Sequence, residues 1–181
     1  MISLVLGGAR SGKSGFAEQR ISTLADAPEH ITYVATARPW PSDQDFAARI
    51  ARHQAQRPAQ WRTEDAEDAI AVLHNPPSDH LIIDDAGTWL TWHFDQSAAW
   101  PGQDGNLADV EKRCAELVAA LRTTTARNIV LVTPEVGLGV IPESAAGRVF
   151  RDQLGSLNAQ LAEVADEVHL VVAGIALTLK S

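Results

Sequence analysis

The chain has 181 residues, 45% of them hydrophobic, so it can bury one sizeable core, and we expect a single nucleotide-binding domain over residues 1–181. The formal net charge of -8 argues against a general nucleic-acid binder, which needs a basic face. One cysteine, Cys114, allows no internal disulfide bond, and no stretch fits a signal peptide or the roughly 20 apolar residues of a membrane span, so we expect a cytoplasmic protein.

Short apolar runs predict the strands of one sheet. They are rich in branched residues, as in strands covered on both faces, and lie at residues 4–6, 31–34, 81–83, 129–132 and 168–172. Stretches of helical character lie between them, for example residues 106–123. This alternation predicts an α/β fold with a mostly parallel sheet. The last run is followed almost at once by residues 175–179, which leaves no room for a crossover helix and predicts an antiparallel C-terminal edge hairpin.

The segment between the first run and the next helix fits the phosphate-binding pattern G-x-x-x-x-G-K-[ST] (Walker A). Its glycines let backbone N–H groups surround phosphate oxygens, the lysine can reach the β- and γ-phosphates, and the serine hydroxyl can bind Mg²⁺. The alternative is a flexible glycine turn, but the strand before it and the helix after it favour a P-loop. The predicted loop consists of Gly7, Gly8, Ala9, Arg10, Ser11, Gly12, Lys13 and Ser14.

A carboxylate is expected to help hold the magnesium at the end of a buried strand next to the P-loop strand. Asp84 directly follows the apolar run 81–83 and is the preferred residue, with Asp85 as the alternate. Asp85 could instead cap the helix that begins at residue 86.

A histidine and several arginines share the segment 43–57 and its surroundings. On the residues alone, the favoured interpretation of His53 is a half-buried side chain beside a solvated arginine face. The other interpretation is a cationic segment that folds over a triphosphate, with His53 as a nucleophile.

The sequence as a whole resembles a known family. The blocks that carry the resemblance are GGARSGKS, YVAT, RIARHQAQRPAQWRT, VTPEVGLGVIPE, FRDQLGSLN and ADEVHLVVAGIALTLK, and they cover nearly the whole chain in order. They are similar to those of the bifunctional adenosylcobinamide kinase/adenosylcobinamide-phosphate guanylyltransferase family of cobalamin biosynthesis. Pro134 and Ala159 depart from the pattern of that family, where asparagine and glutamine are expected.

The resemblance implies two reactions. In the first, the γ-phosphoryl group of GTP or ATP goes to the hydroxyl of adenosylcobinamide. In the second, a histidine attacks the α-phosphorus of GTP and releases pyrophosphate, and the cobinamide phosphate then displaces the histidine to give adenosyl-GDP-cobinamide. The guanylylated histidine falls on His53, which reverses the interpretation favoured by the residues alone. Lys13 then assists catalysis in the same P-loop.

The resemblance also implies a three-layer P-loop NTPase fold, Mg²⁺ held by Ser14 and Asp84, and a homotrimer. The guanine-nucleotide site would include, besides the P-loop, Ala35, Thr36, Ala37, Gln54, Ala55, Gln56, Arg57, Asp65 and Asp84. No nucleic acid partner is expected.

Two alternatives remain at this point. A P-loop kinase that acts on a small molecule has no use for His53. A nucleotide-dependent switch protein usually reads guanine with an N-K-x-D element, and none of Lys13, Lys112 and Lys180 lies in one.

Overall fold

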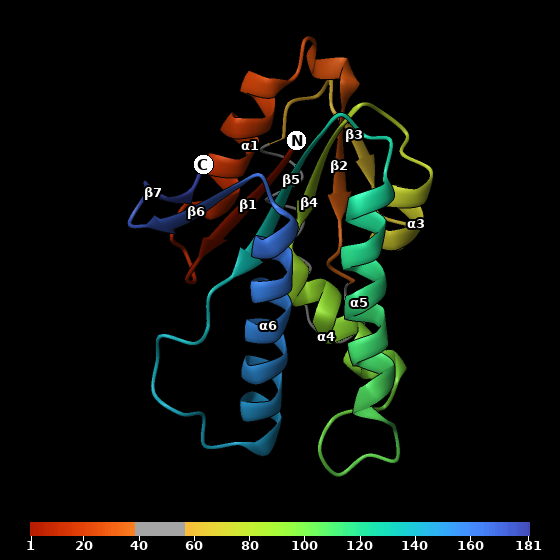
Figure 1. Ribbon diagram of the computed structural model, residues 1–181, viewed down its shortest axis with the longest axis vertical. Coiled ribbons are helices and arrows are strands. Elements are labelled where there is room, and N and C mark those ends of the chain that lie inside the picture. The colour runs from red at the N-terminus through yellow and green to blue at the C-terminus, as the bar shows by residue number, and fades with distance from the viewer. Residues whose placement is uncertain (39–56) are drawn as a thin grey trace.

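The computed structural model describes residues 1–38 and 57–181, and the strands in these ranges form one seven-stranded sheet (Figure 1). Its order is β3-β2-β4-β5-β1-β6-β7, and all neighbours are parallel except β6 and β7. The strands are β1 (Ile2–Gly7), β2 (Ile31–Ala35), β3 (Arg62–Glu64), β4 (His80–Asp84), β5 (Asn128–Pro134), β6 (Glu167–Val172) and β7 (Ile175–Lys180). Each predicted apolar run lies in a strand, so the prediction of a mostly parallel α/β sheet is confirmed.

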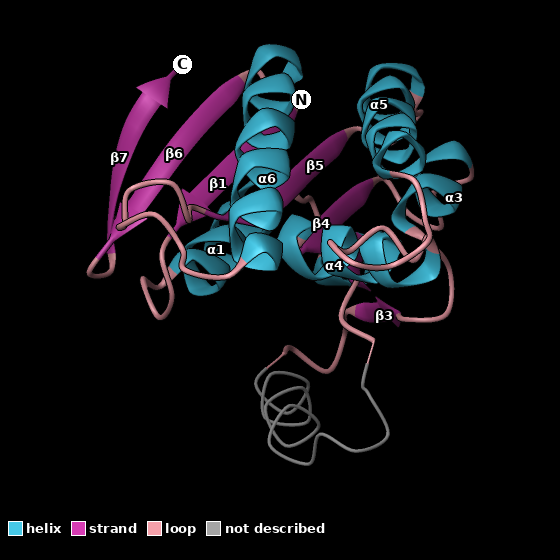
Figure 2. Ribbon diagram, turned by 90° about the horizontal axis from the view of Figure 1, so that it is seen from below, coloured by secondary structure: helices cyan, strands magenta, loops and turns pink. Residues whose placement is uncertain are grey.

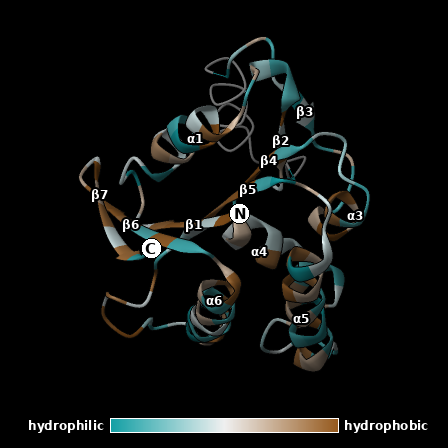
Figure 3. Ribbon diagram, turned by 45° about the horizontal axis from the view of Figure 1, so that its top comes forward, coloured by the Kyte–Doolittle hydropathy of each residue, from teal (hydrophilic) through white to brown (hydrophobic). Residues whose placement is uncertain are grey.

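Helices cover both faces of this sheet and give three layers (Figure 3). The helices are α1 (Lys13–Leu24), α3 (Ala69–His74), α4 (Ala86–Gln96), α5 (Leu107–Thr123) and α6 (Ala145–Val164), with a short 3-10 helix at Pro28–His30. Alternate residues of the strands serve the two faces: Ile82 packs in the cluster with α1, whereas Leu81 and Ile83 pack in the cluster with the other four helices. None of the helices within the two described ranges is long and apolar enough to cross a membrane.

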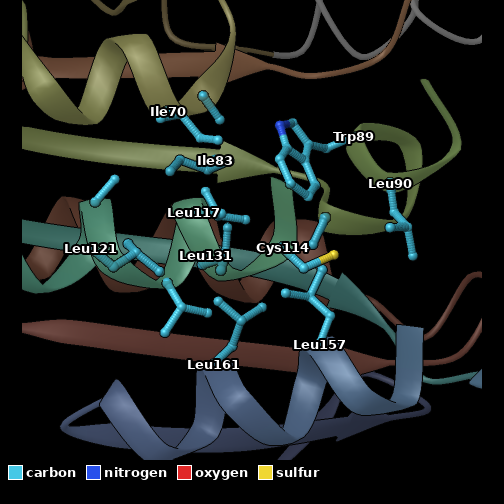
Figure 4. Close-up of a cluster of buried hydrophobic side chains, with 14 of the residues drawn as sticks. Ile70, Ile83, Trp89, Leu90, Cys114, Leu117, Leu121, Leu131, Leu157 and Leu161 are labelled. Atoms are coloured by element: carbon cyan, nitrogen blue, oxygen red, sulfur yellow. The ribbon is translucent and has the colours of Figure 1, made fainter. Parts of the chain in front are cut away.

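The larger core lies between the sheet and α3 to α6 (Figure 4). Cys114 of α5 is buried there among leucines of α5 and α6, and burial raises the pKa of its thiol to about 11. Trp89 of α4 is 3% exposed and contributes to the same cluster, so its side chain serves packing.

The strand that carries Asp84 does not neighbour the P-loop strand, and this expectation was wrong. Strand β5 lies between β1 and β4, and its Leu131 pairs with Leu4 on one side and with Ile83 on the other. The reason is burial, because residues 129–133 of β5 are buried on both faces and such a strand gains most from the middle of the sheet. The parallel carboxyl ends still lie along one edge, so the P-loop and Asp84 can share a site.

The predicted C-terminal hairpin is confirmed. Ala173 and Gly174 join β6 to β7, and both have positive φ angles, 52° and 79°. Such a two-residue turn matches the right-handed twist of the strands that it connects.

Candidate active site

The predicted P-loop connects β1 to α1 and is supported from both sides. The Ser11 N–H donates to the Gly8 carbonyl at 3.3 Å, and the Gly174 N–H of the hairpin turn donates to the Ser11 carbonyl at 2.7 Å. Gly12 begins the helix with a φ of +93°, a conformation that favours glycine. A Cβ atom on Gly7 would lie 2.4 Å from Ser11 Oγ and 2.8 Å from the Val171 carbonyl oxygen, so the turn is also closed tightly at its start.

The P-loop opens onto a cleft of about 340 Å³ at the carboxyl edge of the sheet. Lys13 is 9% exposed and its Nζ lies 3.5 Å from the Gly8 carbonyl oxygen, so the ammonium group is held over the loop that would hold phosphates. The cleft wall includes the predicted residues Ala9, Lys13, Ser14, Ala35, Ala37, Arg57 and Asp84. Residues from four separated parts of the sequence therefore meet in one place.

Asp84 and Arg57 meet through a tyrosine that the sequence analysis did not single out. Tyr33 of β2 is 1% exposed, its hydroxyl donates to Asp84 Oδ2, and Arg57 Cζ lies 3.5 Å from the centre of its ring. Burial and the nearby Asp84 raise the pKa of Tyr33, so it remains a hydrogen-bond donor. Strand periodicity carried a signal for this residue, because Tyr33 precedes the predicted site residue Ala35 by two positions and shares its face of the sheet.

The guanidinium of Arg57 adds a positive charge to the cleft, and two of its nitrogen atoms lack partners in the described part of the chain. Its Nε and Nη1 atoms are buried and have no hydrogen-bond partner among the described residues. Buried donors of this kind are costly unless something pairs with them. Arg57 lines the cleft, so an anion there would face positive charge from Arg57 as well as from Lys13.

Asp85 has the alternative role that its position indicated, because it caps helix α4. Its Oδ1 accepts the Thr88 N–H at 2.7 Å, and burial together with the neighbouring Asp84 raises its pKa. Thr36 holds the backbone at the end of β4. Its hydroxyl donates to the Asp85 carbonyl at 2.7 Å, and its N–H donates to the Asp84 carbonyl at 3.2 Å. Thr36 therefore joins the ends of β2 and β4, whereas its neighbours Ala35 and Ala37 line the cleft.

The lining of the cleft also contains a proline in close contact with a glycine. Pro134, at the end of β5, lines the cleft together with Gly87 of α4. A Cβ atom on Gly87 would lie 2.5 Å from Pro134 Cγ, so the proline ring fills the space that a larger residue would need. The other departure from the family pattern, Ala159, is exposed on α6 and does not line this cleft.

Asp65 is not brought into the cleft. It is exposed in the turn after β3, and Arg38 ties this turn to β2 by donating to the carbonyls of Asp65 and, at 2.9 Å, Glu67. His53, Gln54, Ala55 and Gln56 lie outside the described residues, so their roles stay predictions.

The donor atoms in the cleft fit a magnesium ion that is bound together with a triphosphate. Mg²⁺ prefers oxygen ligands and is commonly held by one or two carboxylates plus substrate phosphates. Asp84 offers a carboxylate and Ser14 a hydroxyl in the same cleft. No cluster of three or more histidine, cysteine or acidic side chains suited to a metal ion occurs in the described part of the chain.

Comparison with known proteins identifies the family. Residues 3–179 match the family model described as cobinamide kinase / cobinamide phosphate guanyltransferase (CobU). The chain belongs to this family. It is therefore an enzyme, as the sequence predicted.

Curated relatives of the family match over nearly their whole length. The chain is 38% identical to the bifunctional adenosylcobalamin biosynthesis protein CobU of Salmonella typhimurium, over 99% of this chain and 100% of that protein. It is 35% identical to the protein of the same description, CobP, of Pseudomonas aeruginosa, over 99% and 98% of the two chains. Among solved structures, the flagellar accessory protein FlaH of Methanocaldococcus jannaschii aligns with a TM-score of 0.49 at 13% identity, over 99% of this chain and 77% of that chain.

Proposed function

We propose that the protein phosphorylates adenosylcobinamide and then transfers GMP from GTP to adenosylcobinamide phosphate through a guanylyl-His53 intermediate. The observation that carries the proposal is the convergence of Lys13, Ser14, Arg57 and Asp84 in one cleft of a chain that matches the cobinamide kinase and guanyltransferase family along its length.

The kinase step needs charge stabilisation more than covalent chemistry from the protein. The acceptor hydroxyl oxygen forms a bond to the γ-phosphorus while the bond from that phosphorus to the β,γ-bridging oxygen breaks. Negative charge grows on the departing diphosphate, and the charge of the transferred group is spread over its three oxygens. Lys13, the backbone N–H groups of the P-loop and Arg57 would bind this charge in the cleft.

Magnesium is part of the proposal. The ion would be held by Asp84 and Ser14, and it would supply neutralisation of the phosphate charge. Tyr33 holds the Asp84 carboxylate for this purpose through its hydroxyl.

The guanylyl step gives His53 a chemical role. A ring nitrogen of the neutral imidazole attacks the α-phosphorus of GTP, and the bond to pyrophosphate breaks. An oxygen of the cobinamide phosphate then attacks the same phosphorus and displaces the imidazole. Imidazole suits both halves, because it is a good nucleophile near neutral pH and a good leaving group once it is protonated.

A homotrimer in the cytoplasm, where nucleoside triphosphates are available, completes the proposal. The edge strand β7 supports self-association, because Ile175, Leu177 and Leu179 are 68%, 53% and 61% exposed. Exposed apolar edges of this kind commonly mark surfaces that another chain covers.

The test is to trap the covalent intermediate. Wild-type protein incubated with α-labelled GTP should acquire a label that is stable to base and labile to acid. His53→Ala should acquire none and should keep measurable phosphorylation of cobinamide. His74→Ala, which changes an exposed histidine at the end of α3, is the matched control and should acquire label as the wild type does.

Two results would contradict the proposal. Wild-type protein that phosphorylates cobinamide and never acquires label would be a kinase without a histidine intermediate. Equal loss of both activities in His53→Ala would mean that His53 is structural.

Lys13→Ala should lower both rates, each by about 10²- to 10³-fold, if one P-loop serves both reactions.

A further inference from the structure

The loop between β5 and α6 exposes an unusual amount of apolar surface. Within residues 135–144, called here the β5–α6 loop, the exposed fractions are 37% for Val136, 84% for Leu138, 96% for Val140 and 69% for Ile141. Figure 1 shows this loop leaving the end of β5, running away from the sheet beside α6 and returning to the start of that helix. Large aliphatic side chains held in water lose the stabilisation that burial would give, and a group of them marks a surface that binds something.

Both ends of this loop are tied to the rest of the protein. At its start, the Glu135 N–H donates to the Gly7 carbonyl of the P-loop at 3.1 Å. At its end, Arg148 donates to the carbonyls of Pro142 and Glu143 at 2.9 and 2.6 Å, and Ser144 caps α6. The two ends of the loop are therefore fixed, which limits where the apolar side chains between them can lie and lowers the entropic cost of binding a ligand there.

The β5–α6 loop is continuous with the cleft. Pro134, Glu135 and Val136 line the cleft wall, and Val136 belongs to both the cleft and the loop. A cleft of about 340 Å³ is at the lower end of the range for small-molecule sites, and in the proposed reactions a nucleoside triphosphate would occupy it. A second, larger substrate can bring only its reacting arm into the cleft, and its bulk must lie on the surface at the mouth.

We propose that the β5–α6 loop is the surface that holds the corrin macrocycle of the acceptor while the hydroxyl arm of the acceptor enters the cleft. This inference rests on the proposed function, which supplies the acceptor. A corrin is a broad, nearly flat ring with methyl groups along its edge, so aliphatic side chains can cover much of its surface. Leu138, Val140 and Ile141 provide this contact.

The polar parts of the loop suit the rest of the acceptor. Gly139 has open space where a Cβ atom would be, so amide side chains of a corrin can reach the backbone beside it. An alkylated cobalt(III) corrin without its nucleotide is a cation, and the carboxylates of Glu135 and Glu143 lie at the two ends of the apolar stretch. The proposed ligand thus matches the loop in both apolar area and charge.

The other possible occupant is a second copy of this chain. The edge strand β7 offers its own apolar residues for that purpose, whereas the β5–α6 loop is the exposed apolar segment that leads directly into the cleft. This continuity favours the substrate, and the experiment below distinguishes the two.

The experiment measures cobinamide binding directly, because corrins absorb visible light and equilibrium dialysis needs no turnover. A variant with Leu138→Ser, Val140→Ser and Ile141→Ser should bind cobinamide at least tenfold more weakly than the wild type. Its affinity for a non-hydrolysable ATP analogue and its mass by light scattering should be unchanged. The matched control, Leu138→Ile with Val140→Ile and Ile141→Leu, keeps the apolar surface and should bind cobinamide nearly as the wild type does.

Several results would overturn the proposal. An unchanged cobinamide affinity in the serine variant would do so, and a change of mass would show that the loop is a contact between copies. If the serine variant does not fold, the single change Val140→Ser at the most exposed position should still weaken cobinamide binding severalfold without affecting the nucleotide. Wild-type protein that binds cobinamide and never phosphorylates it would contradict the proposed function and leave the loop assignment intact.

Discussion

Tyr33 contacts both Asp84 and Arg57, and these two contacts can be removed one at a time. Tyr33→Phe removes the hydroxyl that donates to Asp84 and keeps the ring that lies 3.5 Å from Arg57 Cζ. Tyr33→Leu removes both contacts. Because the two substitutions differ in the aromatic ring, their comparison separates support of the carboxylate from support of the guanidinium.

The expected sizes follow from these contacts. A hydrogen bond to a charged group contributes about 1.5–3 kcal/mol, and loss of a partner that orients a metal ligand weakens metal affinity by about 10- to 100-fold. Tyr33→Phe should therefore raise the Mg²⁺ concentration needed for half-maximal nucleotide binding by about 10- to 100-fold. Loss of a cation–π contact costs about 0.5–2 kcal/mol, so Tyr33→Leu should also weaken nucleotide binding without Mg²⁺ by roughly 2- to 30-fold.

The assay is calorimetric titration of a non-hydrolysable GTP analogue at a series of Mg²⁺ concentrations, and thermal melting followed by circular dichroism checks the fold. Wild-type Mg²⁺ dependence in Tyr33→Phe would refute the support of Asp84 by the hydroxyl. Identical behaviour of the two variants without Mg²⁺ would refute the support of Arg57 by the ring.

Two further predictions concern Glu167 of β6 and Gly12 of the P-loop. Burial would raise the pKa of Glu167, but hydrogen bonds from Arg20 and Ser3 lower it from 4.5 to about 2. The carboxylate therefore stabilises the fold fully above about pH 4.5 and loses this effect as the pH falls toward 2. The difference in free energy of unfolding between wild type and Glu167→Gln, measured with urea, should shrink below pH 4.5, and a constant difference from pH 7 to 3 would contradict this. Gly12→Ala should lower the free energy of unfolding by about 1–2 kcal/mol and weaken nucleotide binding, because φ is +93° and the new Cβ would lie 3.2 Å from Gly174 Cα. Gly15→Ala, with nothing within 4 Å of the new Cβ, is the control and should be neutral or stabilising in the same melts.

The sequence was most informative where one local pattern decides the outcome. The strand runs could be predicted because strands covered on both faces are almost continuously apolar, and the hairpin because two residues cannot span a crossover. Strand β3 carried no such signal, since Arg62 and Thr63 are both exposed. The strand order could not be predicted because it depends on which runs pair over long range. Strand β5, and not β4, lies next to the P-loop strand β1.

The candidate site could be predicted in part for the same reason. Lys13 and Ser14 belong to one contiguous motif, and Asp84 directly follows an apolar run, so local patterns sufficed. The pairing of Tyr33 with Arg57 arises only when β2 and the segment before β3 come together. Asp65 was predicted through the resemblance alone. The structure shows its backbone carbonyl accepting a hydrogen bond from Arg38.

The close approach of Gly87 and Pro134 restricts the order in which this wall of the cleft can change over generations. A proline ring cannot rotate aside, so any side chain at position 87 meets it 2.5 Å away. Gly87 can therefore be replaced only after Pro134 has been replaced by a smaller or more flexible residue. A gene library that randomises both codons together should therefore yield working pairs that two separate single-codon libraries never contain.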